Sequence, residues 1–150
     1  MKIMVSAALS ILLLAIPVMA AEGVIDVQSD FTAAATADRL EKVLLSKGMT
    51  IFNRIKHSEG AAKVGIELRD TELIIFGNPK VGSSLMQCQQ SVAIDLPLKA
   101  LVWEDAGKKI WISYNDPGFL QQRHDIAGCE QVLDKMAAAL DGMTKAAARQ

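Results

Sequence analysis

The feature that most constrains this chain is a series of X-Pro turns between residues 76 and 124. Proline follows Asn78, Leu96 and Asp116, and each pair interrupts a stretch that is otherwise apolar and strand-like. The residue before a proline is driven out of the helical region, and proline itself favours turns. These three points therefore predict where the chain reverses direction. They give the domain its layout, and none of them is a catalytic signature.

The first 20 residues have the pattern of a signal peptide. Lys2 provides a positive charge, residues 3–16 form an uncharged apolar run, and Val18-Met19-Ala20 places small residues where signal peptidase cleaves. The apolar run is shorter than the roughly 20 residues that span a bilayer. We expect residues 1–20 to be removed, which would leave a periplasmic or secreted protein without a stable membrane anchor.

N-terminal sequencing of the exported protein is expected to find Ala21 as the first residue. Cleavage after Ala20 leaves small side chains at both positions that the peptidase contacts. Membrane-bound protein that still begins at Met1 would contradict this prediction.

The remaining residues have the size and composition of one ordinary domain. Removal of residues 1–20 from the 150-residue chain leaves 130 residues, enough for a single core. The net charge of the full chain is −1 and no basic stripe is present, which argues against a nucleic-acid partner. The predicted layout is an N-terminal segment with the first strand (21–31), an α+β domain (32–143) and a fraying helical tail (144–150).

Local patterns predict a single α+β domain, with helices packed mainly on one face of a largely antiparallel sheet. The tetrapeptide Asp105-Ala106-Gly107-Lys108 is a strong hairpin signal between two strands. A helix that begins at Thr32 has apolar residues on one face and ends at Gly48. Strands are expected at 23–27, 50–55, 72–76, 100–104 and 109–114, and helices at 32–47, 58–64, from Ser83 or Ser84, from Phe119 and at 128–143.

Two cysteines, Cys88 and Cys129, would lie in an oxidising compartment after export. The even count permits a disulfide, and the loop that it closes would give a stabilisation of about 4 kcal/mol in the chain-entropy model. Both cysteines also lie in helix-like segments, at positions that suit a small apolar residue. The alternative to the disulfide is therefore two buried free thiols. Both alternatives remain open at this stage.

Four short motifs together resemble the bacterial "domain of unknown function 302" family. They are Asn78-Pro79-Lys80, Asp95-Leu96-Pro97, Val102-Trp103-Glu104-Asp105 and Asp116-Pro117, in this order and spacing. The resemblance covers about Leu40 to His124 and implies a compact α+β domain, sometimes a dimer. Many members carry a cysteine directly after the Leu-Pro pair, where this chain has Leu98, so thiol chemistry at that position is not carried over.

Polar residues in or beside the turns are the candidates for a ligand site: Asn78, Lys80, Asp95, Glu104, Asp116, His124 and His57. Each also has a structural interpretation. Asn78 fits a turn, Asp95 and Asp116 fit caps of backbone amides, and His124 fits the end of a short helix. The two histidines form no HxxxH pair, and we expect no metal site and no cofactor.

Three classes of function follow. The first is a small-molecule or ion-binding module that uses the polar turns. The second is an enzyme with Asp95, Glu104 and His124 as acid, base or ligands, although the sequence contains no Ser-His-Asp order, P-loop or dinucleotide motif. The third is a homodimer formed through the apolar face of the hairpin, on which Trp103 and Trp111 would be cross-strand partners. We rank the binding module first.

Overall fold

The computed structural model describes residues 21–150, so the predicted signal peptide lies outside the described residues. Its centre is one five-stranded antiparallel sheet with the strand order β1-β5-β4-β3-β2. The strands are β1 (Val24–Ser29), β2 (Thr50–Lys56), β3 (Thr71–Gly77), β4 (Leu98–Glu104) and β5 (Ile110–Asn115). The predicted α+β class and the hairpin between β4 and β5 are confirmed.

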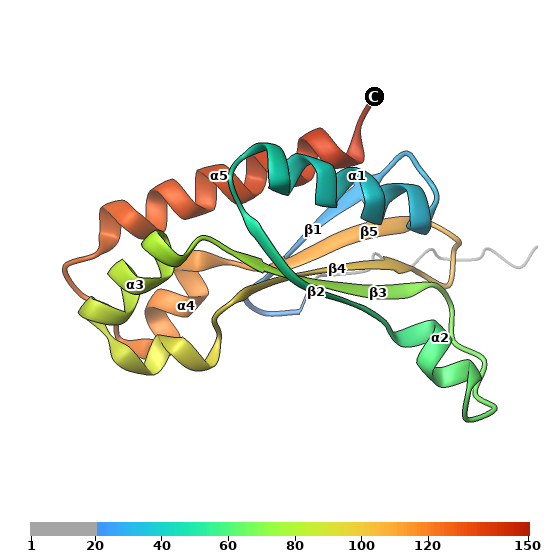
Figure 1. Cartoon of the computed structure of the whole chain (residues 1–150), viewed down its shortest axis with the longest axis horizontal. Coiled ribbons are helices and arrows are strands. Elements are labelled where there is room, and N and C mark those ends of the chain that lie inside the picture. The colour runs from blue at the N-terminus through green and yellow to red at the C-terminus, as the bar shows by residue number, and fades with distance from the viewer. Residues whose placement is uncertain (1–20) are drawn as a thin grey trace, which may run out of the picture.

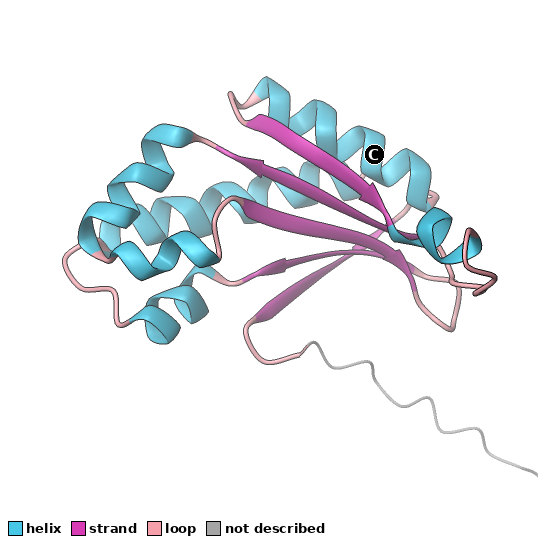
Figure 2. Ribbon diagram, turned by 60° about the horizontal axis from the view of Figure 1, so that its bottom comes forward, coloured by secondary structure: helices cyan, strands magenta, loops and turns pink. Residues whose placement is uncertain are grey.

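The helices form a layer over the sheet, a cluster at one of its ends and a single short helix at the other (Figure 1). The long helices α1 (Ala33–Ser46) and α5 (Glu130–Ala148) lie side by side over one face of the sheet. At one end lie α3 (Pro79–Cys88), the 3-10 helix η1 (Gln90–Ile94) and α4 (Pro117–His124), and at the other end lies α2 (His57–Ala62). Figure 2 shows the strands in front of the long helices, with the other face free of helices.

The core forms between the sheet and the two long helices. Because successive side chains on a strand alternate between faces, every second residue of β3, β4 and β5 points at the helical layer. Most of those residues are buried, as are the facing positions of α1 and α5. The main contributors are Ile74, Phe76, Ala100, Val102, Ile112, Tyr114, Ala37, Leu40, Leu44, Leu133, Met136 and Leu140.

The predicted fraying tail after Met143 is instead the last turn of α5, which continues to Ala148. Thr144 and Ala147 are buried, and the Thr144 hydroxyl donates a hydrogen bond to the Leu140 carbonyl at 2.8 Å. Arg39 of α1 donates to the carbonyl of Ala147 at 2.9 Å. These contacts with α1 and the core hold the end of α5 in place, and the sequence pattern did not reveal them.

Helix α3 also begins earlier than predicted, at Pro79 rather than at Ser83 or Ser84. Proline is favoured in the first helical turn because its missing N–H would have no partner there. The side chain of Asn78 caps the helix by accepting a hydrogen bond from the Lys80 backbone N–H at 3.0 Å. The Asn-Pro pair is therefore both the expected turn and the start of a helix.

The two tryptophans are cross-strand partners, as expected, but they lie outside the core. Trp103 is paired with Trp111 on the helix-free face, and both are half-buried. The Trp103 indole donates to Ser113 Oγ at 2.7 Å, and the Trp111 indole donates to Asp105 Oδ2 at 2.9 Å. The two indole N–H groups are thus satisfied by polar groups of the hairpin.

Replacing Asp105 with asparagine is expected to lower the melting temperature at pH 7. The indole of Trp111 and the Lys109 backbone N–H hold the pKa of Asp105 below its ordinary value. A lowered folded-state pKa stabilises the fold above the unfolded carboxyl pKa of about 3.9, and this contribution is lost as the pH falls through the folded-state pKa. Thermal unfolding should therefore show the effect of the substitution shrinking at acidic pH. Asp134→Asn, on the exposed face of α5, is the control, and equal effects of both substitutions would contradict the prediction.

Candidate functional site

The antiparallel sheet separates the predicted site residues into two groups. Asn78 and Asp95 lie where β3 ends and β4 begins, next to α3, whereas Glu104 lies at the opposite end of β4. A seven-residue strand spans about 20 Å at 3.3 Å per residue, so Glu104 cannot reach Asp95. His57 begins α2 at the same distant end. A single cleft holding His57, Asp95, Glu104 and His124 is therefore excluded.

Asp95 and His124 do come together, at the junction of η1 and α4. His124 Nε2 lies 2.6 Å from Asp95 Oδ2, both side chains are mostly buried, and Arg123 Nη1 lies 3.4 Å from the other carboxylate oxygen. The hydroxyl of Ser91 lies 3.1 Å from His124 Nδ1. The prediction that Asp95 caps a backbone amide is wrong, because its carboxylate binds side chains of α4 that lie 28 and 29 residues away.

The chain Ser91–His124–Asp95 places a hydroxyl, an imidazole and a carboxylate in hydrogen-bonded order. Such an order activates a serine only where a substrate can also be held next to the hydroxyl. An apolar pocket between α3 and α5 and a polar depression beside Glu104 are both lined by other residues. These hydrogen bonds connect η1 and the residue after it to the end of α4.

The other polar candidates have local roles. Asp116 caps α4, as predicted, by accepting a hydrogen bond from the Gly118 N–H at 2.9 Å. Glu104 borders a shallow polar depression of about 480 Å³, formed mainly by residues 67–70. His57 is exposed. Among residues 21–150, no group of three or more His, Cys, Asp or Glu side chains is placed to hold a metal ion.

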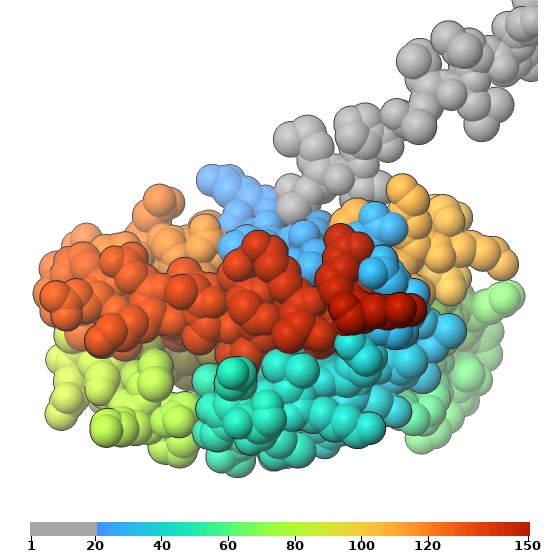
Figure 3. Space-filling model, turned by 90° about the horizontal axis from the view of Figure 1, so that it is seen from above, coloured from blue at the N-terminus to red at the C-terminus, as the bar shows by residue number. Residues whose placement is uncertain are grey.

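An apolar pocket with a volume of about 730 Å³ lies between α3 and α5. Figure 3 looks down on the helical layer and shows a hollow where α3, α1 and α5 meet. The ends of β3 and β4 and the segment between η1 and β4 complete the wall. The apolar lining consists of Met49, Phe52, Pro79, Val81, Leu85, Met86, Ala93, Leu96, Pro97, Leu98, Val132, Met136, Ala139, Leu140 and Met143.

All four methionines of residues 21–150 line this pocket: Met49, Met86, Met136 and Met143. Met49 lies just before β2, Met86 lies on α3, and the other two lie on α5. Only the tertiary fold brings them together. Methionine is flexible and polarisable, and surfaces rich in it adapt to ligands of different shape. This clustering is a signal that the sequence analysis missed, since the methionines of α5 were assigned only to a helical apolar face.

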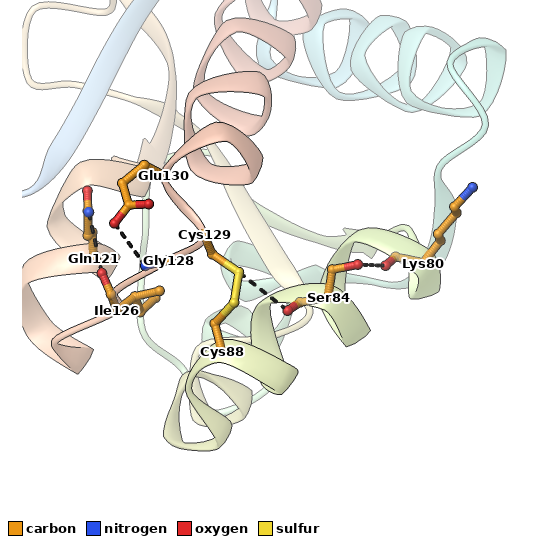
Figure 4. The surroundings of a disulfide bond; sticks show 8 residues. All are labelled: Lys80, Ser84, Cys88, Gln121, Ile126, Gly128, Cys129 and Glu130. Atoms are coloured by element: carbon orange, nitrogen blue, oxygen red, sulfur yellow. Dashed lines mark hydrogen bonds between the residues drawn. A yellow bond between two sulfur atoms is a disulfide. The ribbon is translucent and has the colours of Figure 1, made fainter.

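A disulfide between Cys88 and Cys129 connects the two helices that form the pocket. Figure 4 shows it joining the last turn of α3 to the residue before α5, with Ser84 and Lys80 further back along α3. The Cα atoms lie 6.3 Å apart, within the ordinary range for a bridge. Of the two alternatives left open by the sequence, the structure contains the disulfide. The bond fixes one end of the pocket.

Asn78 and Lys80 are the only predicted site residues that line this pocket. Asn78 caps α3 and Lys80 belongs to its first turn, and the remaining lining is mostly apolar. Most of the lining residues had no polar or catalytic signature and were not predicted as a site.

A single helical layer over a five-stranded antiparallel sheet, with a pocket at one end, defines a small α+β domain. The sequence matches the family "Domain of unknown function DUF302" over residues 25–143, and the chain belongs to this family. A solved relative, the uncharacterized conserved protein DUF302 from Bacillus stearothermophilus, superposes with a TM-score of 0.77 at 17% sequence identity. The match covers 85% of this chain and 99% of that one, which confirms the fold.

Closer in sequence are proteins named as fluoride-specific ion channels. FluC 1 of Brucella suis biovar 1 (strain 1330) and FluC 1 of Brucella abortus biovar 1 (strain 9-941) are each 42% identical over 127 residues. The match covers 84% of this chain but 50% and 47% of those proteins, so the chain spans about half the length of the curated relatives it matches. Within residues 21–150, no helix is long and apolar enough to cross a membrane.

Proposed function

We propose that this protein is a binding module for an apolar small molecule, held in the pocket between α3 and α5. The observation that carries the proposal is the apolar lining of a 730 Å³ cavity, a size within the range of small-molecule sites. In this proposal the apolar wall of the pocket, rather than the polar turns, is the binding surface.

The pocket has the physical properties that such binding needs. Phe52 is 52% exposed at its edge, so apolar surface that water now contacts would be covered by a ligand. Each Å² of apolar surface removed from water contributes about 25 cal/mol. The four methionines can adjust to the ligand, while the disulfide limits how far α3 can move from α5.

The proposal places this binding outside the cytoplasm. Its support is the apolar run of residues 3–16 followed by Val18-Met19-Ala20. An exported module of this kind would hold a poorly soluble molecule in an aqueous compartment.

The binding test uses the neutral fluorescent probe N-phenyl-1-naphthylamine and two matched variants of α5. Ala138 and Ala139 are both exposed, but only Ala139 lines the pocket. Probe fluorescence should rise on binding to the wild type and to Ala138→Trp, and should be lost in Ala139→Trp, where the indole fills the pocket. No binding to the wild type, or equal binding to both variants, would contradict the proposal.

Fluoride provides a second arm of the same test, because the Brucella relatives are named as fluoride channels. A small, strongly hydrated anion gains nothing from an apolar wall. Sodium fluoride should therefore shift the melting temperature no more than sodium chloride does. A specific shift with fluoride that Ala139→Trp abolishes would show that the pocket serves an ion instead.

A second candidate, homodimerisation, is favoured by the helix-free face of the sheet. Trp103 and Trp111 are half-exposed there beside Leu101, which points to the same side. Sedimentation of the wild type should show a dimer, and Leu101→Glu should convert it to a monomer. A wild type that sediments as a monomer at every concentration would remove this candidate.

A further inference from the structure

The charged side chains that line the pocket are all positive. Five polar side chains line it, namely Asn78, Lys80, Ser83, Ser84 and Lys135, and no aspartate or glutamate does. Lys80 belongs to the first turn of α3 and Lys135 to the second turn of α5, so each wall contributes one cation.

Neither lysine has its charge neutralised by the fold. Within residues 21–150, the ion pairs involve Lys56, Lys145, Arg54, Arg123, Arg149 and His124, and neither Lys80 nor Lys135 belongs to one. Both are exposed at the pocket edge, whereas Leu85 and Leu140 deeper in the lining are buried. The pocket therefore has an apolar interior and a cationic edge.

We infer that the natural ligand is an anionic amphiphile, with its apolar part against the methionine-rich wall and its oxyanion head at Lys80 and Lys135. This inference rests on the proposed binding function and names the class of ligand. A flexible lysine ammonium recognises an oxyanion as a point charge, so carboxylate, sulfate and phosphate heads share the required chemistry. A cationic head would meet two like charges.

The test compares three probes with the same twelve-carbon tail: dodecanoate, dodecanol and dodecyltrimethylammonium. Each displaces N-phenyl-1-naphthylamine from the purified protein in competition titrations below its micellar concentration. Dodecanoate should bind most tightly and dodecyltrimethylammonium least. Added sodium chloride should weaken dodecanoate binding and leave dodecanol binding unchanged, because salt screens only the charged head.

Lysine variants locate the head group. Lys80→Met and Lys135→Met should each weaken dodecanoate about two- to fivefold, the effect of one partly exposed ion pair, and leave dodecanol unchanged. Lys145→Met is the matched control, since Lys145 lies on the same helix as Lys135 but is paired with Asp141 and does not line the pocket. Comparison of dodecanoate with dodecyl phosphate then distinguishes a carboxylate source from a phosphate source.

The outcomes separate this inference from the proposal beneath it. Equal affinity for dodecanoate and dodecanol, or lysine variants that bind dodecanoate as well as the wild type, would overturn the anionic head while the apolar pocket stands. Failure of all three amphiphiles and of N-phenyl-1-naphthylamine to bind would overturn both.

Discussion

The double variant Cys88→Ser, Cys129→Ser is expected to unfold with a free energy about 4 kcal/mol lower than that of the wild type. The disulfide joins residues 41 positions apart, and opening a loop of that length restores conformational freedom mainly to the unfolded chain. Urea denaturation of both proteins, followed by circular dichroism, measures the difference.

Reduction provides the control for this prediction. The wild type in excess dithiothreitol should approach the stability of the double variant, whereas the variant itself should not respond to the reductant. A difference of less than about 1 kcal/mol would mean that the reduced chain is held together almost as well as the oxidised one. The double variant should also bind N-phenyl-1-naphthylamine more weakly, because the bridge fixes the separation of α3 and α5.

Arg54→Leu is expected to lower the free energy of unfolding by about 3 kcal/mol. The guanidinium of Arg54 on β2 binds Asp38 and Glu41 of α1 and Glu72 of β3, at 2.8, 2.6 and 2.6 Å. The hydrogen bond that Arg54 donates to Glu72 is the largest cause that raises the pKa of Arg54 well above its usual range. Removal of the cation would leave a mostly buried Glu72 and two further carboxylates without a partner, and breaking a buried pair costs about 3–5 kcal/mol.

A second ion pair nearby is the matched control. Lys56 lies two residues along the same strand and binds Glu59 at 2.8 Å, but both side chains are more than half exposed. Lys56→Met should change the unfolding free energy by less than about 1 kcal/mol. Arg54→Lys should recover only part of the loss, because an ammonium cannot reproduce the fork that reaches three carboxylates. Equal destabilisation by Arg54→Leu and Lys56→Met would contradict the account.

Features set by neighbouring residues could be predicted from the sequence. The hairpin at residues 105–108 depends on turn chemistry, the cap at Asp116 depends on an amide two residues away, and α1 ends before Gly48 as its pattern indicated. In each case the interaction is complete within a few residues, so the local sequence contains the whole argument.

Features that depend on long-range contacts could not be predicted. In the sequence Asp95 resembles a cap, because its actual partner, His124, lies 29 residues away along the chain. The last turn of α5 resembles a fraying tail in the sequence, because the hydrogen bond that holds it is donated to the Ala147 carbonyl by Arg39, 108 residues away. The pocket combines residues from Met49 to Met143, and most of them are apolar side chains that look like ordinary core positions.

The most direct test of the central claim is a nuclear magnetic resonance titration with dodecanoate. It uses protein labelled at methionine methyl groups and at tryptophan indole nitrogens. Met49, Met86, Met136 and Met143 all line the pocket, whereas Trp103 and Trp111 lie on the opposite face of the sheet and do not line it. The account predicts that the methyl signals of these four methionines shift with dodecanoate while both indole signals stay in place. Shifts of the two indole signals with unmoved methionine signals would contradict it.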